Sequence, residues 1–165
     1  MTQMILGGVP VSIFSGEPLV SYGDAGGSTD VILSGGRPVR MTHFSKRVIT
    51  VTGSGWISSG LDGVNLRGEL DFWSPKPLTL ATVSTTATLT AAVRPDEPVT
   101  AEALVGEQWV RAEVTMSDLD ATITPVAGAL VYRLVWFPRF TVLVDPPAED
   151  IGDRQFSWQL VMREV

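Results

Sequence analysis

The chain of 165 residues contains no cysteine and a single histidine, His43. Without cysteine it can form no disulfide, it carries no thiolate nucleophile, and it lacks the thiolate ligands of most structural zinc sites. We therefore expect its stability to come from side-chain packing and backbone pairing.

Charge and long apolar runs are also scarce. Charged residues make up 18% of the chain, the formal net charge is −6, and no basic run is longer than Lys46-Arg47. Nucleic-acid binding needs clustered cations that displace counterions from phosphates, so we expect no sequence-specific DNA or RNA binding. No stretch approaches the ~18 apolar residues of a membrane span, and the N-terminus lacks the pattern of a signal peptide, so we expect no membrane insertion.

No catalytic constellation accompanies the single histidine. The segment Met41–Lys46 alternates as a strand does, and no nucleophile motif lies near it. We interpret His43 as a strand residue with an ordinary hydrogen-bond partner rather than a base or a metal ligand. The sequence thus predicts no enzyme, with no catalytic residue, no metal site and no cofactor.

Two further segments invite a chemical interpretation. The run Thr52-Gly53-Ser54-Gly55-Trp56 lacks the Gly-Lys-Ser/Thr ending of a phosphate-binding loop, and Ser58 stands where a dinucleotide fingerprint has its third glycine. A turn or bulge at a strand end explains it more simply. An acidic segment does not match the calcium-loop spacing and is stiffened by Pro146-Pro147, so we predict a solvated loop; its members are Asp145, Glu149, Asp150 and Asp153.

Apolar positions recur every two residues, the spacing of a strand with one buried face. The pattern is clearest in four stretches: 48–57, 69–73, 108–116 and 156–163. In the last, Phe156, Trp158, Leu160 and Met162 share one face. Sixteen glycines and eleven prolines leave few windows for a helix, and at most a turn or two fits near 117–119 or 148–151. The prediction is an all-β chain, a single β-sandwich or barrel-like domain over 1–165, with two halves possible on either side of a solvent-exposed turn at 94–98.

One stretch, Leu130 to Val144, has almost no polar face. A strand that is apolar on both sides must be covered on both sides, either inside a sandwich or between subunits. Both alternatives stay open at this stage. For the second, the candidate interface residues are Tyr132, Trp136, Phe137 and Phe140, since exposed aromatic residues concentrate binding energy at interfaces.

Five tryptophans raise the alternative of a sugar-binding platform; they are Trp56, Trp73, Trp109, Trp136 and Trp158. All lie in predicted strands or at strand ends beside other apolar residues. Core and interface packing is therefore the stronger interpretation.

The N-terminal half carries a series of glycine turns and strand ends. It runs Leu6-Gly7-Gly8-Val9-Pro10-Val11, Gly16, Ser21, Gly26-Gly27-Ser28-Thr29, Leu33-Ser34-Gly35-Gly36, Met41-Thr42-His43, Ile49 through Trp56, and Gly60-Leu61-Asp62-Gly63. Over about residues 5 to 80 this series resembles the minor or distal tail proteins of long-tailed, non-contractile bacteriophages.

The resemblance implies a β-sandwich subunit that forms a ring, commonly a hexamer, and joins the tail tube to the tip or receptor-binding apparatus. Its partners would be copies of itself and other tail proteins of the tube and tip. Its place would be the virion tail, after assembly in the host cytoplasm. The alternatives are a tail tube or tube-terminator protein and a carbohydrate-binding β-sandwich module.

Overall fold

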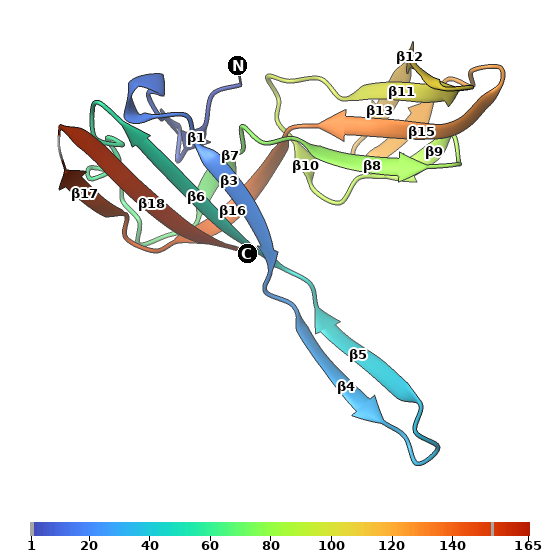
Figure 1. Ribbon diagram of the computed structural model, residues 1–165, viewed down its shortest axis with the longest axis horizontal. Helices are drawn as coiled ribbons and strands as arrows, with labels where there is room; N and C mark the ends of the chain where they lie inside the picture. The colour runs from blue at the N-terminus through green and yellow to red at the C-terminus, as the bar shows by residue number, and fades with distance from the viewer. Residues whose placement is uncertain (1, 153) are drawn as a thin grey trace. The chain divides into compact units, whose positions relative to one another are not determined.

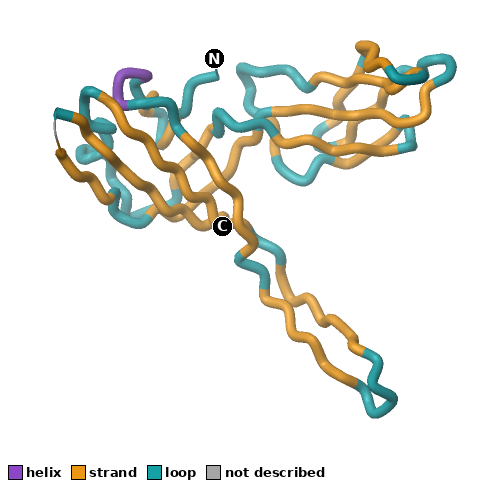
Figure 2. Tube along the Cα trace, in the orientation of Figure 1, coloured by secondary structure: helices purple, strands orange, loops and turns teal. Residues whose placement is uncertain are grey.

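The computed structural model describes residues 2–152 and 154–165, and in this part of the chain the fold is all-β. Its helical content is one short 3-10 helix, η1 (Ile13–Ser15), and the strands form several antiparallel sheets (Figures 1 and 2). The predicted all-β, sandwich-like fold class is confirmed.

The chain divides into two compact units. Unit 1 comprises the residues up to Met4 together with Phe72–Phe140, and unit 2 comprises Ile5–Asp71 and Thr141–Val165. The boundaries therefore fall at 4/5, 71/72 and 140/141, and residues 94–98 lie inside unit 1. The segment Phe72–Phe140 of unit 1 is inserted between the two segments of unit 2. None of the boundaries lies at the turn at 94–98, where the sequence suggested a division between two halves.

Unit 2 contains the N-terminal strands and the C-terminal strands. They are β1 (Ile5–Leu6), β2 (Val9–Pro10), β3 (Leu19–Asp24), β4 (Gly27–Ile32), β5 (Pro38–Phe44), β6 (Arg47–Gly55), β17 (Ala148–Gly152) and β18 (Gln155–Glu164). Two of the three crossings between the units fall within strands, in β7 (Leu70–Trp73) and β16 (Pro138–Val144). The sheet order is β2-β1-β7-β16-β18-β6-β3, with β17 also paired to β18 and β4 paired only with β5.

The pairing of β6 with β18 organises unit 2. Opposite Leu160 lies Val51, and opposite Met162 lies Ile49; all four side chains are fully buried. This bears out the shared face predicted for Trp158, Leu160 and Met162, because alternate residues of a strand point to one side.

Gly53 explains the glycine-rich run in β6. A Cβ atom at Gly53 would lie 2.4 Å from ring atoms of Trp158, the residue opposite it in β18. The indole of Trp158 lies over the glycine, and its Nε1 donates to Ser15 O at 2.7 Å, which holds η1 against the sheet. The predicted strand end is confirmed, because residues 52–55 are the last of β6 and Trp56 lies just beyond it, but Gly53 itself serves close packing rather than a turn or bulge.

Unit 1 is a small β-sandwich. Its strands are β8 (Leu78–Thr82), β9 (Thr86–Thr88), β10 (Ala92–Val93), β11 (Thr100–Val105), β12 (Gln108–Ala112), β13 (Val114–Ser117), β14 (Asp120–Ile123) and β15 (Ala129–Trp136). One sheet has the order β12-β11-β15-β8 and the other β13-β14-β9. Residues from both sheets form one core, in which small side chains such as Ala101 and Ala121 accommodate Tyr132, Leu134 and Trp136.

Arg94 is buried in unit 1, although the sequence placed it in a solvent-exposed turn. Its guanidinium donates to both carboxylate oxygens of Asp96, at 2.9 and 2.7 Å, and to the carbonyl oxygens of Gln3 and Ser74, at 2.8 and 3.0 Å. It also lies 5.4 Å from the centre of the Trp73 ring. These partners make the burial of the cation tolerable and tie the N-terminal residues to unit 1.

A matched pair of leucines in β15 tests the assignment of the unit 1 core. Leu134 is 0% exposed and Leu130 is 66% exposed. We predict that Leu134→Ala lowers the free energy of unfolding by about 2–5 kcal/mol, because it leaves a cavity, whereas Leu130→Ala changes it by less than about 0.5 kcal/mol. Urea unfolding followed by circular dichroism measures both. Equal losses would contradict the burial described for this strand.

Asp96 provides a prediction of pH dependence. Its hydrogen bonds to Arg94 hold the pKa of Asp96 below the ordinary value of 3.8. A carboxyl with a lowered folded-state pKa stabilises the fold above the unfolded pKa, and the contribution disappears as pH falls through the folded pKa. The melting temperature of Asp96→Asn should therefore lie below that of the wild type at neutral pH, and the gap should close below about pH 4. A gap that stayed constant with pH would contradict the role of this ion pair.

Candidate functional site

The segment between β3 and β6, residues 25–46, forms a hairpin that we call the arm. Its two strands, β4 and β5, make a two-stranded sheet of their own, drawn in light blue and cyan in Figure 1. Every residue from Ser28 to Lys46 is exposed. No described residue of the chain covers either face of the arm.

The two faces of the arm differ in chemistry. Directly opposed pairs place Val31 beside Val39 and Thr29 beside Met41 on one face. Phe44 lies on this face too, because its ring covers Gly27, where an added Cβ would approach the ring to 2.4 Å. The exposed fractions of the four large apolar side chains are 41% for Val31, 37% for Val39, 53% for Met41 and 52% for Phe44. We call this surface the apolar face of the arm.

The opposite face is polar over most of its length. Arg40 donates from Nε and Nη2 to the two carboxylate oxygens of Asp30, at 2.7 and 2.8 Å, and Ser28 lies opposite Thr42. This pairing lowers the pKa of Asp30 and raises that of Arg40, although both side chains are surrounded by water. Because water surrounds this ion pair, it contributes little to the stability of the hairpin.

Local sequence explains both ends of the arm. At the tip, Gly36 N donates to Leu33 O at 2.8 Å, and Gly36 has a φ of +74°, a conformation that glycine adopts without strain. At the base, Ala25 N donates to Lys46 O at 2.8 Å. A shift of register between Gly27 and Ser28 then adds one residue to β5 and brings Phe44 to the apolar face.

An isolated two-stranded hairpin is only marginally stable in water. Alternation of apolar and polar positions is the pattern of a strand with one covered face. Full burial of an aliphatic or aromatic side chain contributes about 1.5–3 kcal/mol, so a partner on the apolar face would gain several kcal/mol from four of them. The arm therefore has the composition of an interface element.

His43 lies in the arm, in β5, and is exposed. The strand assignment made from sequence is correct. Among the described residues there is no group of three or more histidine, cysteine, aspartate or glutamate side chains placed to hold a metal ion.

The aromatic residues predicted for a subunit contact lie mostly in cores. Tyr132, Trp136 and Phe140 are 5%, 1% and 3% exposed, and Phe137 is half-buried. Tyr132 and Trp136 belong to the unit 1 core, and Phe140 stacks on Phe72 with ring centres 6.5 Å apart. The two alternatives for the stretch were an interior strand and a subunit contact. In this structure Tyr132, Trp136 and Phe140 are interior residues.

The stretch 130–144 has many apolar residues, but only one face of each of its strands is buried. Along β15 and β16 buried positions alternate with half-buried or exposed ones, so each strand has one buried face. The outward positions include Arg133, which pairs with Glu102 and lies 4.6 Å from the centre of the Trp109 ring. Leu143 is 47% exposed.

The acidic segment is a loop only at its start: Asp145 lies in the connection between β16 and β17, whereas Glu149 and Asp150 belong to β17 instead of a loop or a helical turn. Residues Ala148–Gly152 form β17, which pairs with β18. Asp145 accepts two hydrogen bonds from Arg163, and Glu149 accepts from the backbone N–H and hydroxyl of Ser59. These carboxylates have structural partners. Asp153 lies outside the described residues.

A second exposed apolar surface lies where η1 meets the end of β6. Ile13, Phe14 and Trp56 are 62%, 70% and 85% exposed, and with Ser54 and Gln155 they line a groove of about 360 Å³. The backbone N–H of Trp56 donates to Phe14 O at 2.8 Å, and Ser12 caps η1 by accepting from Phe14 N. We call this the Trp56 groove.

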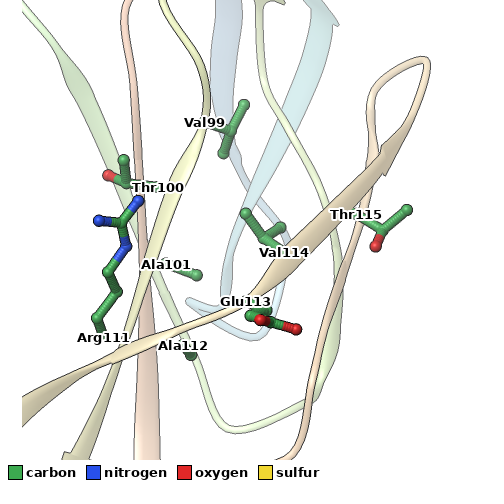
Figure 3. A pocket seen from close by; sticks show the side chains of 8 residues that line it. All are labelled: Val99, Thr100, Ala101, Arg111, Ala112, Glu113, Val114 and Thr115. Atoms are coloured by element: carbon green, nitrogen blue, oxygen red, sulfur yellow. The ribbon is translucent and has the colours of Figure 1, made fainter.

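Unit 1 contains a larger hollow of about 600 Å³ where β12 leads into β13 (Figure 3). Its lining has two charged residues, Arg111 and Glu113, two threonines, Thr100 and Thr115, and four small or apolar residues, Val99, Ala101, Ala112 and Val114. The hydroxyl of Thr100 donates to Val135 O at 3.4 Å rather than to Glu113.

Comparison with protein-family models, with curated proteins and with solved structures finds no match to this chain. The described part of the chain has no helix with the length and hydropathy that crossing a membrane requires. The chain's own surfaces are therefore the guide to its function, and the arm is the most distinctive of them.

Proposed function

We propose that the chain is a structural subunit of a bacteriophage tail, a distal tail protein that forms a homo-oligomeric ring between the tail tube and the tip or receptor-binding apparatus. The observation that carries the proposal is the arm: 19 consecutive exposed residues, from Ser28 to Lys46, that include an apolar face. A free monomer gains nothing from such an element, whereas an assembly covers it.

Two other properties support the same proposal. The arm lies within residues 5 to 80, the part of the sequence that resembles distal tail proteins. The net charge of −6 suits a channel through which DNA slides without adhering. The proposed partners are copies of the chain, hexameric by the resemblance, and neighbouring proteins of the tube and tip; the proposed location is the virion tail.

Adjacent residues of β5 provide a matched test, because Met41 lies on the apolar face and Thr42 on the polar face. Met41→Glu places a charge in the proposed contact and should give a folded monomer. Thr42→Glu adds the same charge on the other side and should assemble as the wild type does. Light scattering after size exclusion measures the mass, and negative-stain microscopy shows whether the wild type forms rings.

Circular dichroism checks that both variants fold. If the wild type is monomeric at high concentration, or if Met41→Glu assembles normally, the arm is not an assembly element and the ring proposal fails. A monomer that binds a glycan array would favour the carbohydrate-binding alternative.

A further inference from the structure

The arm and the Trp56 groove are two different uncovered apolar surfaces of unit 2. They lie at opposite ends of β6: the arm joins β6 at Arg47, and the groove begins at Ser54 and Gly55. We propose that the apolar face of the arm docks into the Trp56 groove of a second copy of this chain. This inference rests on the proposed function and names the acceptor for the arm.

In this structure the arm does not reach the groove of its own chain. The strands β4 and β5 continue from β3 and β6 away from the sheet, whereas the groove lies at the other end of β6 (Figure 1). In this arrangement the occupant of the groove comes from another molecule.

Charge favours a copy of the chain as that molecule. The arm contains Arg37, Arg40 and Lys46 against Asp30, a net charge of +2. The whole chain carries −6, so the rest of it carries −8. A basic arm is therefore attracted to the acidic remainder of a second copy.

Two acidic residues and one basic residue lie next to the groove, a balance that favours a basic occupant. Glu17 follows the groove residue Gly16 and is exposed, and the exposed Asp150 lies across β18 from Ser54 through Ser157. The exposed Arg154 is the basic residue beside the groove residue Gln155. The groove lining itself carries no charged side chain.

The groove also has the chemistry of an acceptor. Its three large apolar side chains, Ile13, Phe14 and Trp56, are more than 60% exposed and stand on a backbone fixed by the Trp158–Ser15 hydrogen bond. Rigid aromatic residues lose little conformational entropy on binding, and for that reason Trp is enriched at binding hot spots. The contact joins two different surfaces, so repetition produces a closed ring or an open filament.

The absence of native cysteine makes disulfide trapping the direct test. One set of single variants places a thiol on the arm, Val39→Cys or Met41→Cys, and the other places a thiol in the groove, Phe14→Cys or Trp56→Cys. One set carries a mass tag. Arm and groove variants mixed under mild oxidation should give disulfide-linked dimers containing one chain of each kind.

Thr42→Cys, on the polar face of the arm, is the control and should give no such dimer with either groove variant. Two arm sites and two groove sites are used because a disulfide needs Cα atoms about 4.4–6.8 Å apart. The double variant Met41→Cys/Trp56→Cys should give ladders of linked chains, since every copy offers both surfaces.

The outcomes separate this inference from the proposed function. Arm variants that link only to themselves would overturn the groove as acceptor in favour of contact between arms. If no arm–groove pair links while the wild type still forms rings, the acceptor is wrong and the ring function stands. If no pair links and the wild type is a monomer, both proposals fail.

Discussion

The packing of Trp158 on Gly53 is the interaction on which unit 2 depends. The indole covers Gly53 of the paired strand β6, and its N–H then fixes η1 through Ser15. Because β6 also pairs with β3, one strand connects the core, the base of the arm and the Trp56 groove. The two proposed contact surfaces, the arm and the Trp56 groove, therefore lie at the two ends of the β6–β18 pair.

The arm differs from the rest of unit 2 in what stabilises it. The strands of the core are held by buried rows such as Val51–Leu160, whereas the arm has backbone pairing, one exposed ion pair and no buried side chain. Its free energy of folding should therefore be coupled to association, since a partner that covers the apolar face stabilises the ordered hairpin by mass action.

Much of the fold follows from sequence periodicity. The face shared by Trp158, Leu160 and Met162 could be read from alternation, and frequent glycine and proline excluded long helices. Apolar and polar residues also alternate in the arm, at Val39 and Met41. Such alternation indicates that one face of a strand is covered, but it does not indicate whether the same chain or another one covers it. For this reason the arm could be predicted as strands but not as a separate element.

The remaining differences have the same origin, long-range partners that local sequence does not reveal. Gly53 is needed because Trp158 lies over it, and Arg94 is buried because Gln3, Ser74 and Asp96 accept its hydrogen bonds. The many apolar residues at 130–144 suggested that both faces of these strands are covered. In the structure of the single chain, however, an outward side chain such as Leu143 is exposed. The interface candidates Tyr132, Trp136 and Phe140 were chosen by residue type, and residue type alone does not distinguish a core from a contact.

Removing the arm tests directly whether it drives assembly. Asp24 and Arg47 are cross-strand partners, so residues 25–46 can be replaced by a two-residue Asn-Gly turn that joins β3 to β6 as a tight hairpin. The mass of this variant and of the wild type in solution is then measured by light scattering. The wild type should be a ring-sized oligomer and the armless variant a folded monomer. If the armless variant still forms the wild-type oligomer, the arm is not the assembly element.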